Sequence, residues 1–310
     1  MKKLLFHECS REELSIQRDL NKILMDEPSE PIPDRLYHYT SINGLEGILK
    51  SKQFWVTHFG FLNDQTELYY TYDLCKKIIF EMSNRDSKTY ELILKFLNPY
   101  LFEFDQQIYI LSLTTNMDSN LLWSNYANND GYNIALDYPR LLEEFRSNDE
   151  GKKYEIRINK VVYDRDEQEK YLKKLISCIF RLVEYHQITE KTEKLPENFE
   201  SFIIVISIFI SLFASFCKDS AFSQEEEVRV IFQKRHNFSI NTDFRISNGS
   251  FIPYIKMPFT TSGKIIKGIT VGPKNKMDIA EKGMELFLKA QGYDYIDDNA
   301  IVKSRIPYRY

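Results

Sequence analysis

The sequence predicts an α+β fold with mixed, mainly antiparallel sheets and an inserted helical layer. Strand-like stretches occur both before and after a long helical region, and those before it follow one another closely in the sequence. Hydrophobic residues make up 43% of the 310 residues and charged residues 28%, which is the composition of a globular protein with a large core. We therefore expect a folded α+β protein.

The chain is expected to consist of an N-terminal helical arm and linker over 1–34 and a single α+β domain over 35–310. Three prolines in EPSEPIPD break regular structure before the domain begins. A helical insertion is predicted at about 166–217, where two long helical patterns flank the polar stretch EKTEKLPEN. The apolar stretch 202–217 is shorter than the ~20 residues of a bilayer span, so we favour a buried core helix there.

The periodicity of the apolar residues predicts the elements in order. Expected strands lie at 36–40, 54–59, 108–115, 132–138, 154–164, 225–232, 251–257 and 267–273, with a final extended segment at 302–310. Expected helices include one over 42–51 with Ser41 as N-cap, one opened by FLNDQTEL with Asp64 and Glu67 at capping-box spacing, and one over 278–291.

Charge and cysteine content limit the function classes. The net charge is −4, with 41 basic and 45 acidic residues interspersed, so bulk nucleic-acid binding is not expected. The four cysteines are widely separated and lack CxxC spacing, which favours reduced thiols. The apolar stretch at 4–6 is too short for the core of a signal peptide. We expect a cytoplasmic protein without a membrane partner, and the sequence does not predict its oligomeric state.

The segment EEEVRVIF carries the clearest candidate for chemistry. Strand alternation is expected to place Glu225, Glu227 and Arg229 on one face, and Glu226 with the apolar residues on the other. Two carboxylates at this spacing disturb each other's proton affinity, and a nearby arginine keeps one of them ionised. A solvated strand face with an internal ion pair is the alternative, but the strand follows the most apolar helix of the chain and is expected to be central.

Polar and aromatic residues elsewhere are candidates for ligand binding. In LYHYTS, His38 alternates with tyrosines, and a structural role fits a lone strand histidine at least as well. Trp55 fits a core position or a stacking one. LLWSNYANN offers Trp123, Ser124 and Tyr126 in a turn, which suits a planar ring and a ribose, although a packed aromatic corner fits equally well. The sequence has no GxGxxG, Walker loop, HExxH or nucleophile elbow.

Five segments together resemble the bacterial DUF2971 family in order and spacing: YHYTSINGLEGILKSKQFWVTHFGFLNDQTE, LLWSNYANNDGYNIALDY, FCKDSAFSQEEEVRVIF, IIKGITVGP and VKSRIPYR. They extend over most of the chain from Leu36 to Arg309. The first segment is also similar to the first strand and helix of ADP-ribosyltransferase-like folds of the DarT type. This resemblance implies an ADP-ribosyltransferase-like core.

The resemblance also implies site residues. Glu227 would be the catalytic glutamate, Glu225 would orient the acceptor, and His38 would hold a ribose of NAD. The implied nucleotide-binding set is His38, Tyr39, Thr40, Ser41, Trp55, Asn63, Asp64, Trp123, Ser124, Tyr126 and Arg229. Departure of nicotinamide leaves an oxocarbenium-like ribose, which a fixed carboxylate stabilises.

We therefore expect an NAD-dependent mono-ADP-ribosyltransferase or NAD glycohydrolase, acting as a bacterial toxin or anti-phage defence effector. NAD or a related nucleotide is the expected substrate, no metal is expected, and the acceptor is not predicted. One alternative is a non-catalytic nucleotide-sensing or partner-binding module. Another is a metal-dependent nuclease built on Asp64, Glu225 and Glu227, for which no lysine stands in the expected relation to the acidic pair.

Overall fold

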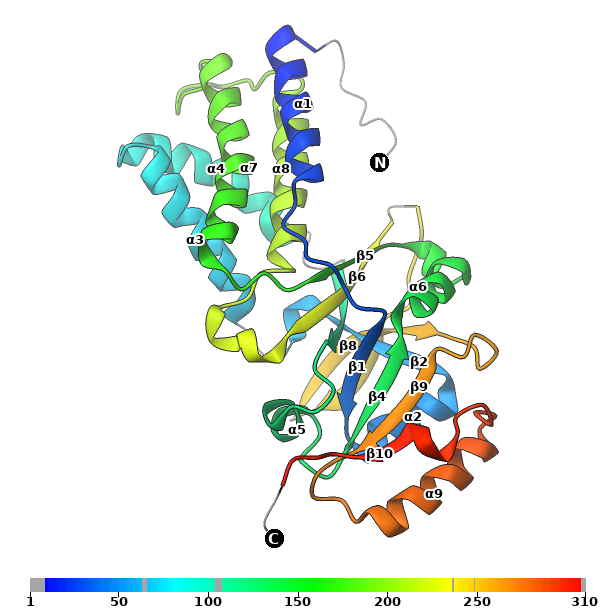
Figure 1. Ribbon diagram of the computed structural model, residues 1–310. Coiled ribbons are helices and arrows are strands. Elements are labelled where there is room, and N and C mark those ends of the chain that lie inside the picture. The colour runs from blue at the N-terminus through cyan, green and yellow to red at the C-terminus, as the bar shows by residue number, and fades with distance from the viewer. Residues whose placement is uncertain (1–8, 63–65, 104–107, 236, 248, 308–310) are drawn as a thin grey trace. The chain divides into compact units, whose positions relative to one another are not determined.

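The computed structural model describes residues 9–62, 66–103, 108–235, 237–247 and 249–307 (Figure 1). The chain divides into two compact units. The helical unit comprises Met1–Ser29, Leu62–Gln107 and Val162–Phe222, and the sheet unit comprises Glu30–Phe61, Ile108–Val161 and Ser223–Tyr310. The single domain expected over 35–310 stays a prediction.

The helical unit consists of helices packed on one another (Figure 1). These are α1 (Arg11–Met25), α3 (Thr66–Met82), α4 (Ser87–Glu103), α7 (Arg165–Tyr185) and α8 (Phe199–Ala214). The two long helices predicted between 166 and 217 are confirmed as α7 and α8. They pack against α1, α3 and α4, and the sequence did not predict this grouping.

A capping box explains where helix α1 begins. At α1, the Ser10 hydroxyl accepts a hydrogen bond from the Glu13 backbone N–H, and the Glu13 carboxylate accepts one from the Ser10 N–H. This capping box satisfies two backbone donors that a helix start leaves free.

Helix α8 is buried around nearly its whole circumference, as a core helix requires. Within the described residues, no helix is both long and apolar enough to cross a membrane.

The sheet unit contains ten strands in the part of the chain that the structure describes. They are β1 (Arg35–Thr40), β2 (Gln53–His58), β3 (Ile108–Thr114), β4 (Tyr132–Asp137), β5 (Tyr154–Lys160), β6 (Glu227–Lys234), β7 (Asp243–Ser247), β8 (Ser250–Pro258), β9 (Ile266–Val271) and β10 (Ile301–Lys303). The helices of this unit are α2 (Ile42–Ser51), α5 (Asn120–Tyr126), α6 (Tyr138–Ser147) and α9 (Met277–Ala290). The sequence did not predict β7, and within the described part of the final extended segment the strand is the short β10.

The strands pair in the order β10-β9-β4-β1-β3-β2-β8-β7, and β6 lies between β3 and β5. Among these pairs of named strands, only β10 and β9 run parallel. The predicted mixed α+β fold with a mainly antiparallel sheet is thus confirmed. Strand β3 pairs with β1 at Tyr37↔Thr114 and with β2 at Thr57↔Ile110, so β1 and β2 share one edge of β3 and form a fork.

The register defines two faces of this sheet, because directly opposed residues in antiparallel strands share a face. The face that carries Leu36, Leu113 and Val228, here the core face, packs against α2, α6 and α9. The opposite face, here the Glu227 face, carries Tyr37, Thr114 and Glu227, and Glu227 is the acidic residue of the predicted cluster that lies on the strand. The two faces therefore separate apolar packing from most of the candidate chemistry.

Candidate active site around Glu227

Glu227 begins the central strand β6 and lies in a row of polar side chains. Thr114 of β3 stands directly opposite Glu227, and Tyr37 of β1 stands opposite Thr114. Two positions further along β6, Arg229 is flanked by Ser112 of β3 and Asn159 of β5. Because opposed residues share a face, all of these side chains lie on the Glu227 face.

Arg229 holds the Glu227 carboxylate with two hydrogen bonds. Nε donates to Oε1 at 2.9 Å and Nη2 donates to Oε2 at 3.0 Å. The Arg229 side chain is 1% exposed and the Glu227 side chain 7%, so the pair is buried. A guanidinium fork fixes the plane of a carboxylate and stabilises its ionised form. The arrangement supplies a negative charge of defined orientation.

Glu225 lies before the strand and not on it. It is buried at the end of the 3₁₀ turn η4 (Ser220–Glu225), where its Oε1 accepts a hydrogen bond from the Tyr126 hydroxyl at 2.9 Å. Its backbone carbonyl accepts one from the Thr114 hydroxyl at 2.7 Å. These two contacts bring Glu225 and Tyr126 to the end of the row that contains Glu227.

The predicted alternation was wrong for Glu226. This residue has a left-handed backbone, with φ of 45°, and an exposed side chain. Its carboxylate accepts hydrogen bonds from the Thr115 hydroxyl at 2.8 Å and from the Asn116 amide at 2.9 Å. Alternation between the two faces applies only within an extended strand, and the strand begins one residue later.

His38 points to the core face, where it shares a side of β1 with Leu36 and lies opposite Ile134. Its Nδ1 is 3.2 Å from the Ser112 carbonyl oxygen, and its ring meets Phe54 edge to face at 5.8 Å. A carbonyl only accepts, so Nδ1 carries a hydrogen. The ring therefore stands at the fork between β1 and β2, and the register does not place it beside Glu227.

Burial lowers the pKa of His38 from its ordinary value, the hydrogen bond to Ser112 opposes this, and the nearby Arg245 charge adds to the lowering. The imidazole is therefore neutral at pH 7. With Nδ1 protonated, Nε2 is the acceptor of the ring.

The aromatic residues divide into packed and exposed ones. Trp123 is fully buried, meets Tyr39 edge to face at 4.7 Å and donates from Nε1 to Asp118 at 2.7 Å. The Tyr39 hydroxyl donates to the Asn116 carbonyl and accepts from the Ser119 N–H. Both rings are thus part of a packed aromatic corner. Trp55 is 44% exposed and stacks on Tyr254 with ring centroids 4.6 Å apart.

The remaining predicted site residues do not join the Glu227 row within the described structure. Ser41 caps α2 by accepting a hydrogen bond from the Gly44 N–H. Thr40 ends β1 against Gly44, where a Cβ would lie 2.0 Å from the Thr40 hydroxyl oxygen. Ser124 is exposed on α5. Asn63, Asp64 and the side chain of Glu67 lie outside the described residues.

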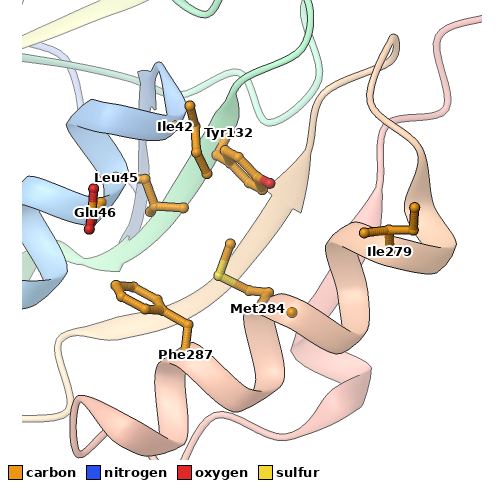
Figure 2. Close-up of a pocket in the computed structure, with 8 residues that line it drawn as sticks. Ile42, Leu45, Glu46, Tyr132, Ile279, Met284 and Phe287 are labelled. Atoms are coloured by element: carbon orange, nitrogen blue, oxygen red, sulfur yellow. The ribbon is translucent and has the colours of Figure 1, made fainter.

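A separate pocket of about 270 Å³ opens on the core face between α2 and α9. Figure 2 shows Met284 and Phe287 of α9 pointing toward α2, with Tyr132 of β4 beside them. The sequence predicted none of these residues as ligand-binding. Since Tyr132 is opposite Thr40 on the core face, this pocket does not join the Glu227 row. No group of three histidine, cysteine or acidic side chains suited to a metal ion occurs in the described part of the chain.

Sequence reasoning missed three residues of the arrangement: Tyr37, Thr114 and Arg245. Tyr37 and Thr114 lie on correctly predicted strands, and alternation already separates Tyr37 from His38. The missing signal was the register between strands, which joins Tyr37, Thr114 and Glu227 in one row. Arg245 lies on the unpredicted strand β7.

Comparison with known proteins bears on the same segments. Residues 122–230 match the DUF2971 family, described as a protein of unknown function. The resemblance inferred from the sequence is confirmed over this part of the chain. The match begins within α5 and ends within β6, so it contains Tyr126, Glu225, Glu227 and Arg229. No curated protein and no solved structure matches the chain.

Proposed function

We propose that this protein breaks the bond between nicotinamide and ribose in NAD, as a mono-ADP-ribosyltransferase or an NAD glycohydrolase. The observation that carries the proposal is the Glu227 carboxylate, which Arg229 holds in a fixed orientation in the row with Thr114 and Tyr37. We also propose that the neighbouring strands β1, β3 and β6 are part of an ADP-ribosyltransferase-like core.

In the proposed reaction, the glycosidic bond breaks and its electron pair goes to the nicotinamide nitrogen. The ribose carbon becomes oxocarbenium-like, and the ionised Glu227 stabilises this charge as it develops. Water or an acceptor oxygen then forms the new bond and loses its proton. Glu225, positioned by Tyr126, lies near enough in sequence and fold to orient the acceptor.

The proposed role of His38 is to accept a hydrogen bond from a ribose hydroxyl through Nε2. This role requires the ligand to reach the fork between β1 and β2, because His38 points to the core face. His38→Gln tests it separately from Glu227. A raised KM with an unchanged kcat is expected if His38 binds the ribose, and unchanged values of both would exclude that role.

Release of nicotinamide from NAD, followed by chromatography, tests the activity. Glu227→Gln is expected to slow release at least about 100-fold, because the stabilising charge is lost. Glu226→Gln is the matched control: it makes the same chemical change one residue away on an exposed side chain and should leave the rate unchanged.

Glu227→Gln also removes the carboxylate charge that pairs with the buried Arg229, so circular dichroism must verify the fold. Glu227→Asp keeps the charge but withdraws the carboxylate, and it should also lose most of the rate. Equal release by the wild type and both folded variants would exclude Glu227 from catalysis.

The biological role that we propose is that of a toxin or an anti-phage defence effector. Loss of NAD, or modification of an essential macromolecule, stops growth. Induced expression of the wild type in bacteria is therefore expected to arrest growth, and the Glu227→Gln variant should not. Growth arrest by both would show that the toxicity does not depend on the proposed chemistry.

A non-catalytic nucleotide-binding module is the second candidate. The burial of the Glu227–Arg229 pair favours this candidate. Both carboxylate oxygens already accept hydrogen bonds from Arg229, and little of either side chain is exposed to a substrate. Such a buried ion pair is also consistent with a structural role, in which it stabilises the sheet without taking part in a reaction. Calorimetry that detects NAD binding without nicotinamide release would support this candidate against the enzyme.

A further inference from the structure

Arg245 carries a positive charge that the described residues do not neutralise. The side chain is half-buried on β7, and Nη2 donates to the Thr57 hydroxyl oxygen at 3.1 Å. Its Nε is enclosed without a hydrogen-bond partner in the described structure. Burial lowers the pKa of the guanidinium, an effect opposed by Tyr254, but an arginine stays charged at neutral pH.

The acidic residue on the same strand is already engaged elsewhere. Asp243 shares a face with Arg245, two positions away, but its carboxylate pairs with Lys256 at 3.1 Å. Within the described ranges, no carboxylate lies in ion-pair contact with Arg245. A guanidinium that has lost part of its water shell without gaining a counter-ion is unfavourable, and a bound anion removes that cost.

The surroundings of Arg245 suit a ligand that combines an anion with a planar ring. Thr57 accepts from Arg245 and keeps its own O–H to donate to an anion. Trp55 and Tyr254 lie on the same face: Tyr254 is opposite Thr57, and its ring stacks on Trp55. Arg245 lies opposite Ile252 and Trp55 opposite Lys256, so Thr57 and Tyr254 stand between the cation and the exposed ring along this face. An exposed aromatic ring and a cation on one face can bind a base and its phosphate.

We propose that Arg245 and Thr57 bind a phosphate group of a nucleotide, with Trp55 against the base. Register places these residues on the Glu227 face, connected to it through β2 and β3. The identification of the nucleotide as the ADP portion of NAD rests on the proposed function. Phosphate binding itself does not depend on any glycosidic chemistry.

The protein contains its own reporter for this site. It has two tryptophans, Trp55 and Trp123, and Trp123 is fully buried in the aromatic corner. Titration of the full chain with ADP at neutral pH and low salt is expected to change the tryptophan fluorescence saturably. Adenosine should bind much more weakly because it lacks the phosphates. Trp55→Phe should remove the signal, with calorimetry then reporting the binding.

Three variants decide the assignment. Arg245→Gln is expected to raise the Kd for ADP about tenfold or more, since a charge-assisted hydrogen bond is lost, and Arg245→Lys should have an intermediate Kd. Lys152→Gln is the matched control, because Lys152 is an exposed lysine outside β2, β7 and β8 whose ion pair is with the exposed Asp149, and it should change the Kd less than about threefold. Melting curves establish that each variant is folded.

The outcomes separate this proposal from the proposed function. ADP binding that depends on Arg245 without any NAD cleavage by the wild type supports the phosphate site and refutes the enzyme. NAD cleavage with an unchanged ADP affinity in Arg245→Gln refutes the phosphate site alone. No binding of ADP to the wild type, or an equal loss in Lys152→Gln, also overturns the proposal, the latter because only general charge attraction would then explain the binding.

Discussion

Arg229 and Arg245 lie on the same face of one sheet, yet their surroundings differ in one decisive respect. Arg229 is almost fully buried and holds the Glu227 carboxylate with two hydrogen bonds. Arg245 is half-buried, and its one hydrogen bond within the described structure goes to a hydroxyl. A compensated arginine organises a carboxylate, whereas an uncompensated one is free to recruit an anion from solution. Three of the following predictions test this difference, and one tests how Glu225 is held beside the compensated pair.

The largest effect is expected from breaking the compensated pair. Arg229→Leu removes the guanidinium that pairs with the buried Glu227 carboxylate, which should lower the free energy of unfolding by about 3–5 kcal/mol. Urea denaturation measures this. In the double variant Arg229→Leu with Glu227→Leu, much of the stability should return, because the buried charge is removed as well. A single variant as stable as the wild type would mean that the pair is solvated.

The next effect concerns the hydrogen bond that positions Glu225. Tyr126→Phe removes the hydroxyl that donates to the buried carboxylate, at a cost of about 1–2 kcal/mol. The same denaturation experiment gives the value. Tyr185→Phe, a change at an exposed ring, serves as the control and should be close to neutral. Equal stabilities of the two variants would show that Glu225 does not need this donor.

The uncompensated charge of Arg245 should also appear in the pH dependence of stability. Burial lowers the pKa of His38 in the folded protein, the hydrogen bond to Ser112 opposes this, and the Arg245 charge adds to the lowering, so the unfolded chain binds this proton more readily. Stability should therefore fall as the pH drops below the ordinary histidine value of about 6.5, by at most about 1.4 kcal/mol per pH unit. Unfolding at pH 7.5 and 5.5 measures the loss.

His38→Gln should reduce that loss, and Arg245→Gln should reduce it partly, because the Arg245 charge is only one of the causes of the lowered pKa. An unchanged pH dependence in His38→Gln would assign the acid sensitivity to other groups.

The smallest effect on the free energy of unfolding is expected from removing the uncompensated charge of Arg245. Arg245→Leu removes one hydrogen bond to Thr57 but also the cost of a half-buried charge, so the stability should change by less than about 1 kcal/mol. Denaturation of Arg245→Leu beside Arg229→Leu makes the comparison direct. A loss as large as that of Arg229→Leu would contradict the proposed difference between the two arginines.

Much of the local structure was predictable because its causes are local. Ser41 caps α2 through the Gly44 N–H three residues ahead, and this could be read from the sequence. The strands that carry His38, Thr114 and Glu227 follow from short apolar or alternating runs. The carboxylate-arginine pair on β6 is also local, since its members are two residues apart and strand geometry places them on one side.

Other parts of the candidate site depend on contacts between distant segments. Glu226 was predicted to continue the alternation, but hydrogen bonds from Thr115 and Asn116 accompany a left-handed backbone at that position. Trp123 fitted either ring binding or packing. Tyr39 and Asp118, which bury it in a corner, could not be identified as its partners from periodicity.

By itself, the sequence determined the kinds of elements, the position of the acidic cluster at the start of β6 and the resemblance to the DUF2971 family. Only the tertiary structure decided that Tyr37 and Thr114 join Glu227, that His38 turns to the core face, and that Arg245 reaches Thr57 across 188 positions of the chain. Alternation along a strand is a property of a few neighbouring residues. Register is decided by the packing of strands that are distant in the sequence, and it alone determines which side chains share a site.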